Sequence, residues 1–99
     1  PAVAHLYAPL HPAVLRLIAG TIAAGRAHGK PVCVCGEMAG DAAMTALLLG
    51  LGLRSFSMHP ARILAVKQQI LQSDASRLAA WAQAVIASDE PAELLAQRP

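Results

Sequence analysis

A short apolar run at residues 32–34 limits how this chain can fold more than any other feature of its sequence. The run reads Val-Cys-Val, follows Lys30-Pro31 and is followed by Cys35. A strand without polar alternation is typical of a parallel sheet that is covered on both faces. Residues 36–41 then form a loop that contains two glycines. The sequence therefore predicts a buried strand of an α/β protein, with a loop at its carboxyl end.

Helix and strand signals alternate along the chain. Residues 55–58 predict a second strand, and apolar residues at helical spacing predict the helices. The expected helices cover residues 12–28, 42–49 and 62–72, a segment from Asp74 through Ile86, and a short segment after Pro91. Asp41 and Asp74 are placed to accept the free amide hydrogens of a first helical turn. We expect residues 1–11 to be a loop, and the strands to be joined by a right-handed parallel crossover.

The composition favours a chain that packs against further protein. Of the 99 residues, 56% are apolar and only 14% are charged, a balance that suits buried segments better than an independent small domain. The chain opens at Pro1 without an initiator Met, and it has no apolar run near the roughly 20 residues that a membrane span needs. We expect a soluble part of a longer protein, without membrane insertion.

The charge pattern gives no reason to expect a nucleic acid as partner. The net charge is +2, Lys and Arg are scattered, and the chain holds one Trp, one Tyr and one Phe. Nucleic-acid binding requires a basic patch, and single strands also require aromatic side chains on which bases can stack. Neither feature is present in the sequence.

Cys35 is the candidate for chemistry, and the residues alone leave three roles open for it. It could fill the core, bind a metal or react with oxidants, or act as a catalytic acid or nucleophile. Loops at the carboxyl ends of parallel strands gather reactive groups, Gly36 lets the backbone approach a ligand, and Glu37 adds a carboxyl. A free thiol has a pKa of roughly 8.5, so at neutral pH it carries a proton that it can donate.

Cys33 shares one face of the predicted strand with Cys35. We expect it one layer deeper, as part of the core. The two Cβ atoms would lie too far apart for a disulfide, which needs a separation of about 3.5–4.5 Å. The spacing does not form the chelating turn of a zinc site either, so no metal site is expected in this chain. Two reduced thiols indicate the cytoplasm.

The histidines have no ligand-like spacing among themselves. His59 follows the second strand, on the rim where we also place Cys35, so it could touch a ligand. His5 and His11 flank the loop before the first helix and could line a site. His28 is placed as a cation at the end of a helix.

Several segments together resemble a known family. They are Val34-Cys35-Gly36-Glu37-Met38-Ala39-Gly40-Asp41, residues 47–53, Phe56-Ser57-Met58, and the upstream residues 5–7 and 9–18. In this order they resemble the C-terminal part of the phosphoenolpyruvate–protein phosphotransferases, the enzyme I family of the bacterial sugar phosphotransferase system. This family is one branch of the phosphoenolpyruvate-utilising enzymes. The stretch that begins at Cys35 is the most specific part of the resemblance.

The resemblance implies a fold. Residues 1–99 would be the C-terminal portion of a phosphoenolpyruvate-binding TIM (β/α)8 barrel, with strands 7 and 8 parallel, surrounding helices and a helical tail. A complete barrel needs roughly 250 residues, so this chain would be part of one. The resemblance also implies a homodimer in the cytoplasm that needs Mg²⁺.

The resemblance implies a function as well. Members of this family move a phosphoryl group from phosphoenolpyruvate to an enzyme histidine, and on to a histidine-containing phosphocarrier protein for sugar uptake. The family's catalytic cysteine falls on Cys35, as general acid and base at the methylene carbon of enolpyruvate. Gly36 and Glu37 are substrate-binding candidates, with Glu37 orienting the loop. The family's phosphate-binding arginines, magnesium-binding carboxylates and phosphorylated histidine are expected before Pro1, so the chain alone should be inactive.

Other functions remain open at this point. The chain could be a non-catalytic module for dimerisation or association. The same module also occurs in fused multiphosphoryl-transfer proteins and in relatives such as pyruvate phosphate dikinase. That dikinase tends to have His-Gly where Met38-Ala39 stand, and phosphoenolpyruvate synthase tends to have Gln in place of Glu37.

Overall fold

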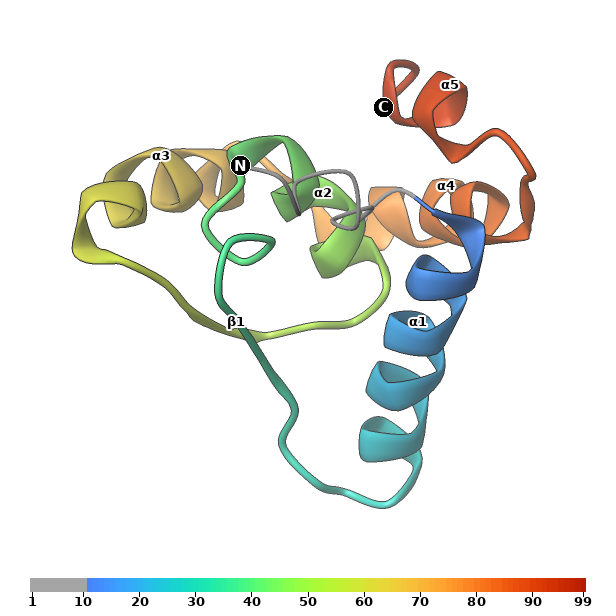
Figure 1. Cartoon of the computed structure of the whole chain (residues 1–99), viewed down its shortest axis with the longest axis horizontal. Coiled ribbons are helices and arrows are strands. Elements are labelled where there is room, and N and C mark those ends of the chain that lie inside the picture. Colours follow the sequence, from blue (N-terminus) through green and yellow to red (C-terminus); the bar gives the residue numbers. More distant parts are fainter. Residues whose placement is uncertain (1–10) are drawn as a thin grey trace, which may run out of the picture.

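The computed structural model describes residues 11–99 and shows five α-helices and two short β-strands (Figure 1). In chain order they are α1 Pro12–Ala27, β1 Cys33–Cys35, α2 Ala42–Gly50, β2 Ser55–Ser57, α3 Pro60–Leu71, α4 Ala75–Ala87 and α5 Pro91–Leu95. Every helix and strand that we expected within this range is confirmed. The expected loop at the start of the chain and His5 lie outside the described residues.

The two strands pair in parallel, as the sequence predicts, and α2 connects them. The register places Cys33 beside Ser55, Val34 beside Phe56, and Cys35 beside Ser57. Because successive side chains of a strand point to opposite faces, each pair in register shares a face. The chain is therefore a small, mostly helical α/β unit with two parallel strands.

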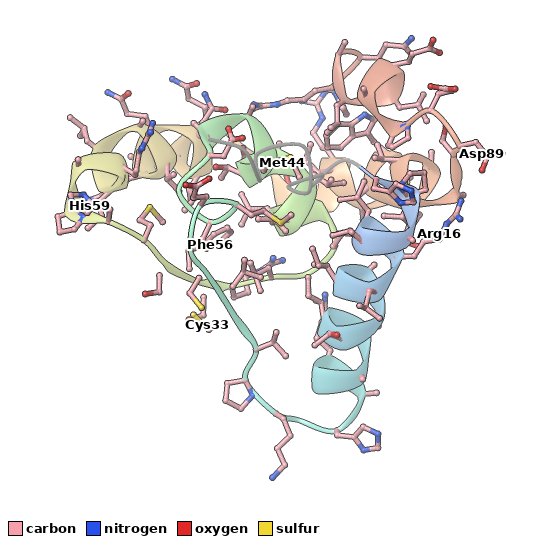
Figure 2. The ribbon with its side chains drawn as sticks, in the orientation of Figure 1. Arg16, Cys33, Met44, Phe56, His59 and Asp89 are labelled. Carbon is pink, nitrogen blue, oxygen red and sulfur yellow. The ribbon has the colours of Figure 1, made fainter. Side chains whose placement is uncertain are left out.

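The two faces of this sheet differ in what covers them. Val34 and Phe56 are half-buried and pack against the hydrophobic core. All four side chains of the other face are exposed: Cys33, Cys35, Ser55 and Ser57. Figure 2 shows Phe56 on the side of α2 and Cys33 on the opposite side of the strands. The helices thus cover one face of the sheet and leave the thiol-bearing face open.

This arrangement corrects two expectations. A sheet covered on both faces is wrong for the described residues, and so is the placement of Cys33 in the core, because Cys33 is exposed. A strand buried on both faces needs a second covering layer, and residues 11–99 supply only the layer of helices. The apolar pattern does indicate a strand, but what would cover its second face is not among these residues.

The core is built around α2. Six consecutive residues of this helix are buried, from Met44 to Leu49, so the Leu47-Leu48-Leu49 run serves packing. The helix packs against both α3 and α4, and α1 contributes Leu15 and Ile22 to the same core. A helix that is apolar all round is typical of a position inside a layered fold. Burial of α2 fixes the loop that precedes it.

Long-range hydrogen bonds hold the remaining helices in place. The Arg16 side chain on α1 donates from Nε to the Ile86 carbonyl at 2.8 Å. It also lies 3.6 Å from the Asp89 carboxylate (Figure 2). On α4, Trp81 Nε1 donates to the Leu94 carbonyl of α5 at 2.8 Å. Within residues 11–99, no helix combines the length and the apolar character needed to cross a bilayer.

Candidate functional site

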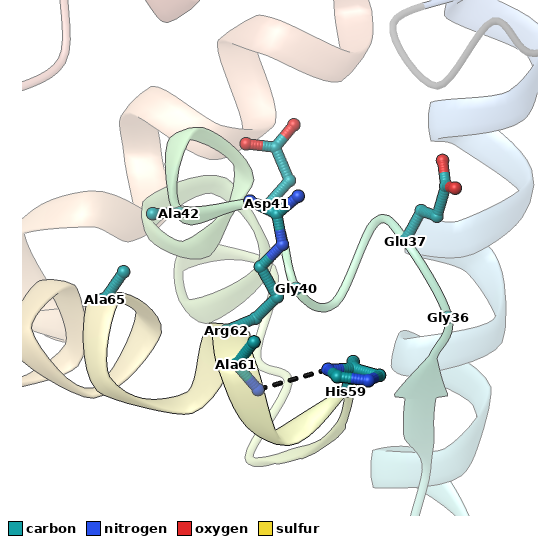
Figure 3. Close-up of a pocket in the computed structure, with 9 residues that line it drawn as sticks. All are labelled: Gly36, Glu37, Gly40, Asp41, Ala42, His59, Ala61, Arg62 and Ala65. Carbon is teal, nitrogen blue, oxygen red and sulfur yellow. Dashed lines mark hydrogen bonds between the residues drawn. The ribbon is translucent and has the colours of Figure 1, made fainter.

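A hollow of about 970 Å³ opens beyond the carboxyl ends of the strands (Figure 3). Its walls come from the loop after β1, the first residue of α2, and the start of α3. The lining residues are Gly36, Glu37, Gly40, Asp41, Ala42, His59, Ala61, Arg62 and Ala65. In proteins with parallel strands, this edge of the sheet is where ligands bind. The hollow is therefore the candidate site.

The loop after β1 takes its shape from a glycine and from buried apolar side chains. Gly36 has a φ of 87°, which lies in the left-handed region that favours glycine. The Gly40 amide donates to the Gly36 carbonyl at 3.3 Å, which closes the turn. Met38 and Ala39 are buried below the loop. Their anchoring leaves Glu37 exposed, and Figure 3 shows its carboxylate directed away from His59.

Asp41 and His59 each begin a helix at the rim. Asp41 Oδ1 accepts a hydrogen bond from the Ala43 amide at 2.9 Å, which confirms Asp41 as the cap of α2. His59 Nδ1 accepts from the Ala61 amide at 3.2 Å and caps α3 in the same way. A neutral imidazole that accepts at Nδ1 carries its hydrogen on Nε2. The expectation that His59 lies on this rim is confirmed, because it lines the hollow.

Capping by histidine is a role that the sequence analysis missed. His11 caps α1 with the same geometry, since its Nδ1 accepts from the Ala13 amide at 3.1 Å. In both helices the histidine precedes a proline at the first helical position. Proline lacks an amide hydrogen, and a side chain that accepts from the next residue suits this position. The repeated His-Pro pair was the signal available in the sequence.

The loop after β1 also packs directly on α3, through Gly40 and Arg62. A Cβ added to Gly40 would lie 3.1 Å from Cγ of Arg62 and 3.5 Å from Cβ of Met58. Any side chain at this position would require the stem of Arg62 to move by a few tenths of an ångström. Sequence reasoning singled out the glycines of the loop but not Arg62, because nothing local links two residues so far apart in the chain.

Cys35 ends β1 on the open face of the sheet, and the two residues after it line the hollow. Its side chain is exposed and lies on the face opposite the helices. Cys35 itself is not among the residues that line the hollow. The three candidates from the sequence are thus consecutive along the rim. Gly36 and Glu37 face the hollow, and the Cys35 thiol lies on the adjoining sheet face.

The described part of the chain does not form a metal centre. Between residues 11 and 99, no group of three or more His, Cys, Asp or Glu side chains is placed to hold a metal ion. Of the two carboxylates at the hollow, Asp41 is engaged as a helix cap. The carboxylates at the hollow therefore do not fit a magnesium ion, which prefers several oxygen ligands in an octahedral arrangement.

Comparison with known proteins gives matches over most of the chain. The model of the "PEP-utilising enzyme, PEP-binding domain" family matches residues 1–75, where PEP is phosphoenolpyruvate. A phosphoenolpyruvate-protein phosphotransferase of Cupriavidus necator is 58% identical over 92 residues, which cover 93% of this chain and 16% of that protein. Proteins of the same name from Bacillus subtilis and Buchnera aphidicola (Schizaphis graminum) are each 39% identical. These two matches cover 95% and 94% of this chain, respectively, and 16% of each relative.

These relatives are much longer than the chain. The chain spans 16% of the length of the Cupriavidus, Bacillus and Buchnera proteins. The matched residues include β1, the loop with Cys35, and the hollow.

Proposed function

The chain belongs to the PEP-utilising enzymes, through their PEP-binding domain, and on this basis we propose that it supplies the proton-transfer part of a phosphotransferase active site. The observation that carries the proposal is the position of Cys35. Cys35 is the last residue of a parallel strand, and its thiol is exposed on the face that the helices leave open. A thiol on the helix-covered face would have been sealed from any substrate.

The proposed setting is the last quarter of a TIM (β/α)8 barrel, with β1 and β2 as its seventh and eighth strands. Both strands have a free edge in the described structure, since the sheet order is β1 followed by β2 alone. An apolar groove adjoins each edge. The groove beside β1 is lined by Leu17, Ile18, Thr21, Ile22, Val32, Cys33 and Val34, and the groove beside β2 by Phe56, Ser57, Met58, Ile63, Val66, Lys67 and Ile70.

Neighbouring strands of a barrel would pair with these edges and fill both grooves. In such a barrel the face that carries Cys33 and Cys35 points inward, away from the ring of helices. Side chains at the carboxyl ends of the strands then face the substrate. This setting gives the exposed thiols a covering layer and brings Cys35 to the mouth of the barrel.

The proposed chemistry is a proton transfer at carbon. When the phosphoryl group leaves PEP for an enzyme histidine, the enolate of pyruvate remains. The Cys35 S–H bond then breaks, its proton binds the methylene carbon, and the products are the methyl group of pyruvate and a thiolate. In the reverse direction the thiolate removes a methyl proton. One group that acts as acid and base in this way contributes roughly 10²- to 10⁴-fold in rate.

Gly36 and Glu37 have supporting parts in the proposal. The backbone of Gly36 forms the tight turn that lets the loop approach the substrate. Glu37 is exposed at the hollow and makes no hydrogen bond to Cys35 within residues 11–99, so it would orient the loop or a neighbouring polar group. Mg²⁺ would be held by carboxylates elsewhere in a longer protein, where it would supply positive charge to the phosphoryl group.

The whole enzyme in this proposal is a phosphotransferase of the sugar-uptake system. It would pass its phosphoryl group from the enzyme histidine to a histidine-containing phosphocarrier protein, and it would work as a cytoplasmic homodimer. Phosphoryl transfer depends on cations that position and neutralise the transferred group. Because the hollow offers a single arginine, Arg62, the chain alone is expected to be inactive.

A second candidate function is association without catalysis. The observation in its favour is the exposure of large apolar side chains on α1 and α3, above all Leu17 at 74%, Leu64 at 69% and Leu71 at 75%. Exposed apolar patches of this kind mark surfaces that bind other protein. In the barrel proposal the same side chains would be covered by the rest of the barrel, so the two functions differ only in the role of Cys35.

Substitution of the two cysteines in the longer protein separates these functions. We expect Cys35→Ala and Cys35→Ser to lower the turnover between PEP and pyruvate at least about 100-fold, because each removes the acid and base. Binding of PEP, measured by equilibrium titration, should remain. Cys33→Ala is the matched control and should be far milder. Equal losses from Cys33→Ala and Cys35→Ala would show that the proton donor is misassigned.

A further inference from the structure

We propose that Ser57 is a positioning residue for Cys35, and that its hydroxyl hydrogen-bonds to the Cys35 sulfur and stabilises the thiolate. This inference rests on the proposed function, in which Cys35 becomes a thiolate each time it protonates carbon. The evidence is the parallel register of the strands, the open face that both side chains share, and the packing of the preceding pair, Val34 and Phe56, against the core.

The register brings the two side chains together. Cys35 and Ser57 are Cα partners and the last residues of β1 and β2. Neighbouring strands lie about 4.8 Å apart, and residues in register point to the same face. A hydroxyl and a thiol on partner residues are therefore side by side and within reach of a hydrogen bond when their rotamers turn toward each other.

The helix-covered face holds this pair in place. Val34 and Phe56, the partners one residue earlier, are half-buried and pack against the core. A slip of one residue would turn these two side chains to the open face and remove them from the core, so the register is strongly specified. The core thus determines which residue of β2 stands beside Cys35.

Both groups are free to make the new interaction. Neither the Cys35 thiol nor the Ser57 hydroxyl has a hydrogen-bond partner within the described residues, and both are exposed. The other titratable groups on the strand and loop of Cys35 are Cys33, Glu37 and Asp41, and His59 follows β2. Of the groups on the neighbouring strand, Ser57 alone is in register with the thiol.

The direction of the effect follows from hydrogen-bond chemistry. A hydroxyl that donates to a thiolate stabilises the charged form and so favours loss of the proton from sulfur. In the proposed reaction this speeds donation of the proton to the enolate. Without the hydroxyl, the thiol would hold its proton more tightly, and deprotonation would need a higher pH.

Alkylation of Cys35 across a pH series tests this directly. In the longer protein that carries a Cys33→Ala background, iodoacetamide reacts with the Cys35 thiolate, which displaces iodide and forms a C–S bond. Mass spectrometry of the peptide that holds Cys35 gives the rate at each pH. We expect Ser57→Ala to raise the midpoint pH of the reaction by about half a unit to one unit.

Two matched variants complete the experiment. Ser57→Thr keeps a hydroxyl and should keep the midpoint of the unsubstituted protein. Ser55→Ala removes the hydroxyl beside residue 33, one layer lower on the same face, and should also leave the midpoint unchanged. A merely structural role of Ser57 would change reactivity at every pH without moving the midpoint.

The inference is overturned if Ser57→Ala has the same midpoint pH of alkylation as the unsubstituted protein. It is also overturned if Ser55→Ala raises this midpoint as much as Ser57→Ala does. Either result leaves the proposed function standing, because that proposal depends on turnover after substitution of Cys35. Conversely, a Cys35→Ala protein that keeps its turnover would remove the proposed function even if the midpoint shift were found.

Discussion

Gly36 is the residue that turns the chain from the strand with Cys35 into the loop of the candidate site. Its φ of 87° is unfavourable for any residue with a Cβ, although an added Cβ would meet no atom within 4 Å. The cost of a substitution here is therefore a backbone cost and not a steric clash. We expect a substitution at Gly36 to change the conformation of the loop before it disturbs the packing of the core.

Substitution of Gly36 should separate these two costs. Gly36→Ala forces an L-residue into the left-handed region, at about 1–2 kcal/mol. Asparagine visits this region more readily, so Gly36→Asn should cost less. Unfolding in urea measures both variants. If Gly36→Ala is as stable as the unsubstituted protein, the turn does not require its positive φ.

At the scale of the residue, sequence reasoning proposed Cys35, Gly36 and Glu37 as site residues from their place after an apolar strand, and the structure places Gly36 and Glu37 at the hollow. Sequence reasoning could not place Cys33, because exposure depends on which elements cover a face, and periodicity does not give that. It also missed Ser57, whose proposed role depends on the register with β1. Long-range pairing of two strands has no local signal.

At the scale of the element, α2 and α4 begin at aspartate caps that the sequence predicts. Asp74 caps α4, and its Oδ1 accepts from both the amide and the hydroxyl of Ser76. The pKa of Asp74 is lowered from 3.8, mainly by the hydrogen bond from the Ser76 side chain and then by the one from the Ser76 amide. The charged form of Asp74 therefore stabilises the folded state.

This cap should make stability depend on pH. The folded-state pKa of Asp74 lies below its unfolded value of 3.8, so its contribution is full above pH 3.8 and is lost as the pH falls through the lowered pKa. We expect Asp74→Ala to unfold at a lower temperature than the unsubstituted chain at neutral pH, with the difference shrinking in acid. Asp74→Asn keeps an acceptor without a charge and should show a smaller difference at neutral pH. A difference that stays constant from neutral pH into strong acid would contradict the assignment.

Two glycines in helices have opposite surroundings and should respond oppositely to alanine. A Cβ on Gly50, at the end of α2, would lie 2.8 Å from Cβ of Ala82 on α4. Gly50→Ala should therefore push these helices apart and cost about 1–3 kcal/mol. A Cβ on Gly20, inside α1, meets nothing within 4 Å, so Gly20→Ala should gain about 0.5–1 kcal/mol.

Thermal or urea unfolding of both variants measures the pair. The contrast isolates the effect of the close contact between α2 and α4, because both substitutions add the same methyl group. A stabilising Gly50→Ala would contradict the close packing of α2 against α4 at this glycine.

Helix positions could be predicted from the sequence because each helix carries its own local signals. The apolar spacing, Asp41, Asp74 and the prolines at the helix starts gave bounds close to those observed. The position of β1 followed from its short apolar run, and that of β2 from the segment Ser55-Phe56-Ser57-Met58 between two expected helices. Burial of the sheet could not be predicted, since a run such as residues 32–34 looks the same whether one or two layers cover it.

At the scale of the whole molecule, the chain leaves apolar surface and strand edges uncovered. Leu17 on α1 and Leu64 on α3 are exposed at 74% and 69%, and each strand has one unpaired edge within the described residues. Uncovered edges and apolar patches promote association. The barrel itself rests on the family resemblance, because no pattern within this chain states how many strands a complete sheet would have.

We therefore expect the isolated chain to associate in solution. Light scattering across a concentration series should show a rising mean mass. The double variant Leu17→Lys/Leu64→Lys should lower this association, because charged side chains resist burial. Gln68→Lys, which adds a charge on α3 without removing an apolar side chain, is the control. If the isolated chain stayed monomeric at every concentration, the exposed apolar side chains would not be a surface that binds other protein.

The central claim is that the Cys35 thiol exchanges a proton with the methyl carbon of pyruvate. The most direct measurement is the incorporation of deuterium from D₂O into that methyl group by the longer protein, followed by NMR. We predict steady incorporation with the unsubstituted protein and with Cys33→Ala, and a loss of about 100-fold or more with Cys35→Ala. Incorporation by Cys35→Ala at an undiminished rate would contradict the claim.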